Sequence, residues 1–105
     1  DMRRPHLLSK IKEVLHSVAP NAQVILFGSE ARGEARADSD FDILILEDVD
    51  RITPAMQVAI EDPLYALWLD EDIEVSPIIK TKSDWENRPF ATPFYNNILK
   101  DGINI

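Results

Sequence analysis

Apolar residues follow two patterns along the chain, one with helical spacing and one in short uninterrupted runs. Residues 3–18 carry apolar side chains three and four positions apart, which predicts an amphipathic helix that Pro20 ends. Two short runs rich in β-branched residues, 23–27 and 41–46, predict buried strands. The second run contains consecutive apolar residues, which favours burial on both of its faces.

The second half of the chain continues this alternation. Residues 54–69 are predicted to form a second long helix, which Pro63 either kinks or splits. The run 73–79 predicts a third strand, and Pro77 places it at a sheet edge or where pairing stops. The expected buried stripe of the second helix consists of Met56, Ile60, Leu64, Leu67 and Trp68.

Short elements complete the prediction. Ser83 begins a capping box for a short helix, residues 88–92 form a loop, and a last helix runs from Pro93 to about Leu99. The final residues 103–105 either add a small strand or simply pack at the end. We therefore expect one domain over residues 1–105 of the α+β (α/β) class, with a small mixed sheet and helices packed mainly on one face.

Composition narrows the range of partners. The chain has 11 Lys and Arg residues against 19 Asp and Glu residues, a formal net charge of −8. This balance argues against broad, charge-driven binding to nucleic acid or to an anionic membrane surface. It allows a nucleotide, because a divalent ion inverts the local field, and it allows a basic protein partner. With no cysteine, no apolar run long enough to span a bilayer and no apolar leader, a cytoplasmic protein is the expectation.

The stretch between the first two strands carries the candidate chemistry. The first strand stops at Gly28 and Ser29 and opens into a short helix, where outward-pointing N–H groups can bind phosphate oxygens. Asp40 and Asp42 stand two apart at the mouth of the second strand, so both carboxylates share one face. An anion cradle beside paired carboxylates suits a nucleoside triphosphate bound with its metal.

The pattern G-S-x-A-R-G, a short spacer and then S-D-x-D before an apolar strand resembles the signature of the polymerase-beta superfamily of nucleotidyltransferases. The matching residues are Gly28, Ser29, Ala31, Arg32, Gly33, Ser39, Asp40 and Asp42. The chain is most similar to the minimal nucleotidyltransferases that prokaryotes encode beside HEPN-domain proteins. The resemblance implies a nucleotidyltransferase fold.

The same resemblance assigns roles to these residues. It implies that Asp40 and Asp42 are catalytic and hold two Mg²⁺ ions. It implies nucleotide binding by Gly28, Ser29, Arg32 and Ser39. For Arg32 an alternative stays open, since this side chain could instead pair with an acidic neighbour, Glu30 or Asp38, and hold the loop.

Active relatives carry a third carboxylate on a neighbouring strand, which ligates a metal and deprotonates the attacking hydroxyl. The candidates are Asp72 and Glu74, and alternation does not separate them because both lie on one face. We favour Glu74 as the third catalytic and metal-binding residue, because it stands inside the apolar run and Asp72 stands at a turn. Most relatives have the shorter aspartate at this position.

The resemblance implies transfer of a nucleoside monophosphate, AMP from ATP, onto an acceptor hydroxyl. The chain is too short to hold an acceptor of its own, so the acceptor is expected on a partner protein. In the HEPN-associated group the transferase is an antitoxin that modifies a tyrosine of a HEPN ribonuclease. Two alternatives remain: a catalytically weak module that neutralises its partner by contact, and a nucleotide or Mg²⁺ sensor without turnover.

Overall fold

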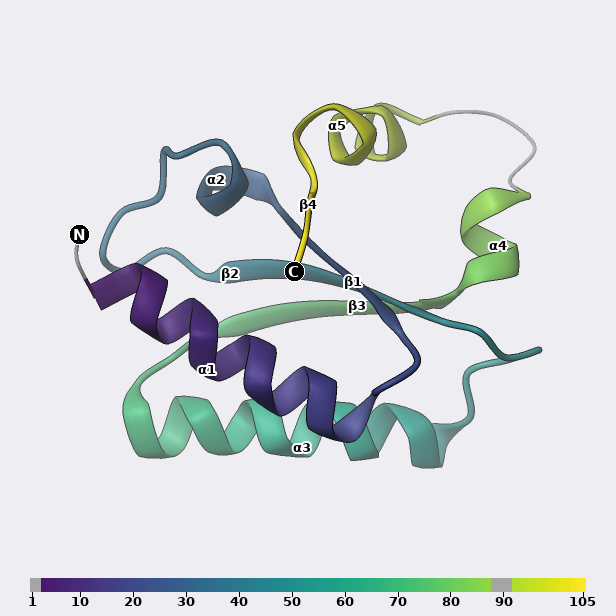
Figure 1. Ribbon diagram of the computed structural model, residues 1–105, viewed down its shortest axis with the longest axis horizontal. Helices are drawn as coiled ribbons and strands as arrows, with labels where there is room; N and C mark the ends of the chain where they lie inside the picture. The colour runs from purple at the N-terminus through teal and green to yellow at the C-terminus, as the bar shows by residue number, and fades with distance from the viewer. Residues whose placement is uncertain (1–2, 88–91) are drawn as a thin grey trace.

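The computed structural model describes residues 3–87 and 92–105, arranged as a four-stranded sheet with helices on both faces (Figure 1). The elements in chain order are α1 (Arg3–Val18), β1 (Gln23–Phe27), α2 (Gly28–Ala31), β2 (Phe41–Glu47), α3 (Pro54–Glu71), β3 (Val75–Thr81), α4 (Lys82–Glu86), α5 (Pro93–Asp101) and β4 (Ile103–Asn104). The closing residues therefore form a small strand, one of the two outcomes that the sequence left open.

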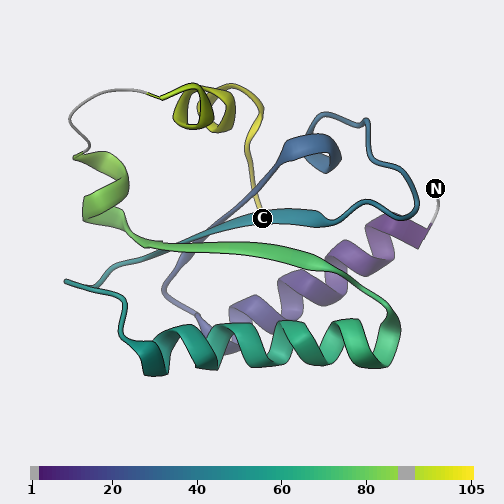
Figure 2. The same cartoon turned by 180° about the vertical axis from the view of Figure 1, so that it is seen from behind.

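The sheet is mixed, with strand order β3-β2-β1-β4. β1 runs antiparallel to both β2 and β4, while β2 and β3 are parallel and are joined through α3. The long helices α1 and α3 lie side by side across one face, and the short helices α2, α4 and α5 lie over the other (Figures 1 and 2). The predicted α+β class and mixed sheet are confirmed, and the two long helices share one face as expected.

The central strand β2 supplies both layers of the core. Ile43 and Ile45 pack toward α1 and α3, whereas Leu44 and Leu46 belong to a second cluster that includes Trp85 of α4. All four aliphatic side chains are buried, so the predicted burial of this strand on both faces is confirmed. A strand enclosed in this way holds its first residues, where the chemistry is expected, in a fixed place.

Helix α3 differs from the prediction in two ways. It continues through Pro63 as one helix, so the expected split does not occur. Its buried stripe includes Ile60, Leu64 and Leu67, but Trp68 is 45% exposed, so the predicted burial of Trp68 is wrong. The apolar stripe toward α1 and the sheet is narrower than the sequence pattern indicates.

Three smaller boundaries also shift. β3 begins at Val75 rather than at residue 73, while its position at the sheet edge, expected from Pro77, is confirmed. α2 begins at Gly28, directly after β1, and no side chain caps its first turn by a hydrogen bond. Thr81 rather than Ser83 caps α4, because its hydroxyl accepts the N–H of Asp84 at 3.0 Å.

The loop predicted over residues 88–92 lies outside the described residues except for its last position. Within the described ranges, none of the helices combines the length and the apolar character that crossing a bilayer requires.

Candidate active site

The turn at Gly28 and Ser29, which the sequence predicts to bind phosphate, lies directly against Asp42. Gly28 begins α2 with a φ of 73°, a left-handed backbone conformation that favours glycine. The register of β1 and β2 places Phe27 opposite Asp42, so the turn passes beside the Asp42 carboxylate. A Cβ built at Gly28 would overlap Asp42 Oδ2, which means that only glycine allows this close approach. The two halves of the sequence motif therefore meet in space.

Asp40 and Asp42 form an electrostatically coupled pair. Asp42 is half-buried near the start of β2, and its side chain shares a face with Leu44. Burial raises the pKa of the Asp42 carboxyl, and the nearby charge of Asp40 raises this pKa further. The positive charge of Arg32 acts in the opposite direction, which places its guanidinium within electrostatic reach of the pair. The predicted pairing of the two aspartates is thus present in the fold.

A serine on the neighbouring strand completes this small cluster. The parallel register of β2 and β3 sets Ser76 opposite Asp42. The Ser76 hydroxyl donates a hydrogen bond to Asp40 Oδ2 at 2.9 Å. Ser76 is therefore the residue of β3 that lies beside both aspartates.

Glu74 does not join the two aspartates. It precedes β3 and is exposed, and its carbonyl oxygen accepts the N–H of Phe41 at 3.0 Å. Asp72 is exposed as well, at the C-terminal cap of α3. Among the described residues, no group of three or more His, Cys, Asp or Glu side chains is placed to hold a metal ion. The expected convergence of three carboxylates is therefore not found among the described residues, and the residue of β3 opposite Asp42 is Ser76.

The remaining predicted residues lie around this cluster. Arg32 pairs with Glu34 at 3.2 Å on the surface, and not with either of the two neighbours considered from the sequence. Such an exposed pair is weak, so the guanidinium can exchange it for a phosphate. The hydroxyl of Ser39 accepts the N–H of Arg36 at 2.8 Å and so fixes the loop before β2. Ser29 is the second residue of α2, next to Gly28.

The donor set fits a magnesium ion that is bound together with a nucleotide. Mg²⁺ prefers oxygen ligands and is commonly held by one or two carboxylates plus the phosphates of its substrate. Asp40 and Asp42 offer carboxylate oxygens only, and a divalent cation would offset both the burial and the charge of Asp40 that raise the pKa of Asp42. The site is therefore suited to a metal that arrives with the triphosphate.

Sequence reasoning missed two residues near this site, Ser76 and Arg4. Ser76 is a small polar residue inside an apolar run, and only the strand register reveals its neighbour. Arg4 is 5% exposed in the first turn of α1. A signal for Arg4 was present, because it continues the four- and three-residue spacing of Leu8, Ile11 and Leu15 and so belongs to the buried face of the helix.

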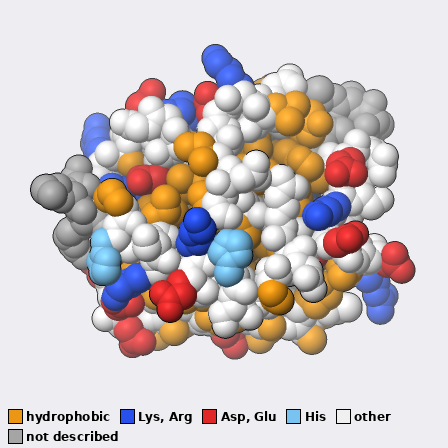
Figure 3. Space-filling view, in the orientation of Figure 1, with side chains coloured by type: hydrophobic (Ala, Val, Ile, Leu, Met, Phe, Trp, Pro, Cys, Tyr) orange, Lys and Arg blue, Asp and Glu red, His pale blue; other side chains and the backbone are white. Residues whose placement is uncertain are grey.

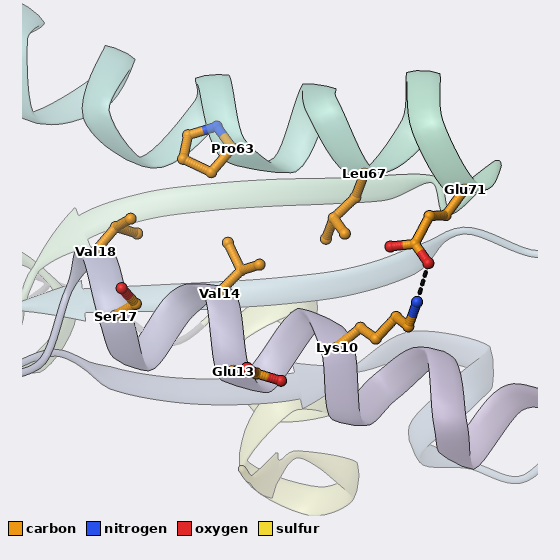
Figure 4. Close-up of a pocket in the computed structure, with 8 residues that line it drawn as sticks. All are labelled: Lys10, Glu13, Val14, Ser17, Val18, Pro63, Leu67 and Glu71. Carbon is orange, nitrogen blue, oxygen red and sulfur yellow. Dashed lines mark hydrogen bonds and ion pairs between the residues drawn. The ribbon is translucent and has the colours of Figure 1, made fainter.

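A cavity also lies on the other side of the molecule from the aspartate pair. A groove of about 470 Å³ separates α1 from α3, and Figure 4 shows Val14, Val18 and Leu67 directed into it. An ion pair between Lys10 and Glu71 joins the two helices at one end of this groove. The lining residues come from α1 and α3 alone, so this groove is separate from the aspartate pair.

The surface charge is mixed on the face that Figure 3 displays. Basic and acidic side chains are interspersed there, without a continuous basic area among the coloured residues.

Comparison with known proteins agrees with the geometry. A family model described as "Nucleotidyltransferase domain" matches residues 8–103. A protein of Methanocaldococcus jannaschii named as a "putative protein adenylyltransferase" is 31% identical over 83 residues, which covers 76% of this chain and 73% of the relative.

Two solved structures share the fold. One, described as a toxin-antitoxin with AMP-PNP, has a chain that superposes with a TM-score of 0.62 at 22% identity, covering 91% of this chain and 69% of its own. The other is a complex of the tri-AMPylated HEPN toxin of Shewanella oneidensis with its MNT antitoxin, with a TM-score of 0.57 at 19% identity and coverages of 95% and 69%. At these identities the likeness establishes the fold.

Proposed function

The chain belongs to the nucleotidyltransferase domain family, and from this premise we propose that it transfers AMP from ATP to a hydroxyl group on a partner protein. The observation that carries the proposal is the contact between the two halves of the motif, in which Gly28 lies against Asp42. This contact would place the phosphates of a nucleotide, held at the turn, beside a carboxylate pair. A family member whose turn and aspartates were far apart could not bind a metal–nucleotide complex in this way.

Each residue has a defined task in this proposal. The backbone N–H groups of Gly28 and Ser29 donate hydrogen bonds to phosphate oxygens, and Arg32 adds positive charge. Asp40 and Asp42 hold Mg²⁺, for which two ions are expected. When bound, Mg²⁺ neutralises charge on the triphosphate and stabilises both the entering and the departing oxygen. The acceptor oxygen forms a bond to the α-phosphorus, the bond to the pyrophosphate oxygen breaks, and the hydroxyl proton passes to solvent.

The likeness to toxin-antitoxin structures supports a HEPN-type protein as the acceptor. One of those complexes contains an AMPylated HEPN toxin, and the M. jannaschii relative is named as a protein adenylyltransferase. On this proposal the chain is the antitoxin of such a pair, and transfer of AMP silences the toxin.

This function is tested with ATP labelled at the α-phosphate, Mg²⁺ and a HEPN-type protein encoded beside the gene. We expect the label to appear on the partner and pyrophosphate to be released in equal amount. Removing divalent ions with EDTA should abolish transfer, and added Mg²⁺ should restore it, because the two carboxylates act only through the divalent metal ion that they hold. Absence of labelled partner with every nucleotide tried, while the complex forms normally, would refute the proposal.

A second function, neutralisation by contact alone, is favoured by the absence of a third carboxylate beside Asp40 and Asp42 among the described residues. Relatives with full activity use that group as a base, so its loss points to slow or absent chemistry. The two functions differ in the behaviour of Asp40→Ala. If this variant binds the partner and still inhibits it, contact is sufficient. If it binds without inhibiting, AMP transfer is required.

The outer face of α3 is the surface that we propose for the partner. It exposes Val58, Tyr65, Trp68 and Leu69, with the Tyr65 and Trp68 rings 5.5 Å apart. A groove of about 320 Å³ separates this face from the edge strand β3. Glu61 and Glu74 line this groove, and α3 and its C-terminal cap carry further exposed acidic residues, Asp62, Asp70 and Asp72. An apolar face with an acidic rim fits a HEPN-type protein that presents apolar side chains among basic ones.

Two exposed leucines give a matched test of this surface. Leu69, on α3, is 63% exposed and Leu99, on α5, is 62% exposed. We expect Leu69→Ala to weaken partner binding several-fold and Trp68→Ala to weaken it by about tenfold or more, since buried aromatic anchors dominate interfaces. Leu99→Ala should leave the affinity measured by calorimetry unchanged. Equal effects of the two leucine substitutions would place the interface elsewhere.

A further inference from the structure

One buried arginine at the start of α1 contacts both halves of the nucleotidyltransferase motif. Arg4 Nε donates to Glu30 Oε2 at 2.6 Å, and Glu30 belongs to α2, the helix that begins with the phosphate-binding turn. Arg4 Nη1 donates to the carbonyl oxygens of Arg36 and Ala37 at 2.9 and 3.2 Å. Arg4 Nη2 donates to the carbonyl oxygen of Ser39 at 3.0 Å. One guanidinium therefore ties α2 to the loop before β2.

Arg4 contacts the residues immediately before and after Asp40 in the sequence. The residue before Asp40 is Ser39, whose carbonyl oxygen Arg4 holds. The residue after it is Phe41, and the Arg4 guanidinium lies 4.3 Å from the centroid of the Phe41 ring. The backbone on each side of Asp40 is thus fixed by the same side chain, while Ser76 fixes the Asp40 carboxylate itself.

Apart from Arg4, the loop is held by hydrogen bonds within its own turns, such as the one from the Arg36 N–H to the Ser39 hydroxyl. Residues 32–38 contain no strand, and most of their side chains are exposed. An exposed connection of this kind ordinarily samples several conformations. Arg4 opposes this with a rigid planar fork of donors that is itself 5% exposed, and a lysine could not bridge the same acceptors.

From this geometry we infer that Arg4 is a positioning residue, which holds the phosphate-binding turn and Asp40 in the relative geometry needed to bind a metal–nucleotide complex. The inference rests on the proposed function only in identifying what binds there. Arg4 should therefore affect nucleotide affinity beyond any effect on stability, because weaker contacts from this residue would let the loop beside the site move.

The test measures binding of Mn²⁺ with a non-hydrolysable ATP analogue to the full chain, by calorimetry well below the melting temperature. We expect Arg4→Lys to raise the dissociation constant by about 10–100-fold, the range seen when groups that orient metal ligands are changed. Amide hydrogen exchange of residues 36–41 should accelerate in the same variant. Arg51→Lys is the matched control, since Arg51 is exposed in the connection beyond the far end of β2.

A second variant separates positioning from folding. Arg4→Leu combined with Glu30→Leu removes both charges, so no carboxylate is left unpaired, and it should fold where Arg4→Leu alone does not. We expect this double variant to remain folded at the temperature of the measurement, although three backbone carbonyls lose their donor, and still to bind the analogue weakly. A double variant or Arg4→Lys that binds the analogue like the unchanged protein would overturn the inference. Failure of the unchanged protein to transfer AMP would count against the proposed function alone, because the affinities would still be measurable.

Discussion

Asp42→Asn is expected to reduce nucleotidyl transfer by at least about 100-fold and, in the absence of metal, to make the protein more stable at neutral pH. The loss of activity follows because charge stabilisation by a bound metal is worth several kcal/mol, and each 1.36 kcal/mol is a factor of ten in rate. The gain in stability follows from the position of Asp42, whose charge is partly desolvated and lies near that of Asp40. Asparagine keeps the shape and removes this unfavourable charge.

The direction of the stability change follows from the difference in the Asp42 pKa between the folded and the unfolded state. In the unfolded chain the Asp42 carboxyl loses its proton near its ordinary pKa of 3.8, whereas in the folded protein its pKa is raised. The folded state therefore binds the proton more tightly, and the stability that this binding contributes is lost as the pH rises from 3.8 through the folded pKa. The stability advantage of Asp42→Asn should be present at pH 7 and should vanish below about pH 4, near the unfolded carboxyl pKa.

Thermal unfolding of the metal-free proteins at several pH values measures the first effect, and single-turnover transfer with labelled ATP measures the second. Asp50→Asn serves as the control, since this exposed aspartate lies beyond the far end of β2. With Mg²⁺ and nucleotide the order of stability should reverse, because only the unchanged protein gains from the bound complex. An Asp42→Asn variant that is less stable than the unchanged protein at pH 7 without metal would show that the Asp42 charge does not destabilise the folded state.

Gly28→Ala is the second substitution with a large expected effect. The left-handed φ of 73° costs a residue with a Cβ about 1–2 kcal/mol. The added Cβ would also overlap Asp42 Oδ2 and lie 3.1 Å from Asp42 Cγ. Because the Asp42 side chain would have to move, transfer should fall by about 100-fold or more, as it does when a metal ligand is displaced.

Gly33→Ala provides a control with the same backbone cost and without the overlap. Gly33 has a φ of 72°, and a Cβ there would meet nothing within 4 Å. Both variants should lose stability in denaturant unfolding, Gly28→Ala more than Gly33→Ala because of the overlap, whereas only Gly28→Ala should lose activity at temperatures where both are folded. If Gly33→Ala were equally inactive, backbone strain rather than displacement of Asp42 would explain the loss.

The sequence predicted the elements well where a local pattern determines them. The strands at β1 and β2 and the helix α1 follow from apolar spacing, and Pro20 and Pro54 mark boundaries that chemistry imposes. Pro63 shows where local rules fail. Its ring prevents one hydrogen bond, to the carbonyl of the exposed Ala59, and packing through Ile60 and Leu64 on either side holds the helix together.

The turn and the aspartates of the candidate site were predictable from the sequence, whereas their neighbour on β3 was not. Gly28 and Asp42 belong to a continuous motif, and the hairpin that joins their strands brings them together. The partner on β3 depends on the register of a parallel pair, which no local pattern specifies, and this register sets Ser76 opposite Asp42. Arg4 lies 36 residues before Asp40, and its role depends entirely on how α1 packs.

The parallel pairing of β2 with β3 also determines when the site is completed as the chain is synthesised. The hairpin of β1 and β2 can form once the first half of the chain has left the ribosome, which brings Gly28 beside Asp42. Ser76 joins them only after α3 has emerged and carried β3 back to the sheet. A nascent chain therefore passes through a period in which the turn and the aspartates are assembled but the Asp40 carboxylate lacks its hydrogen bond from Ser76, and this bond forms only after translation has passed β3.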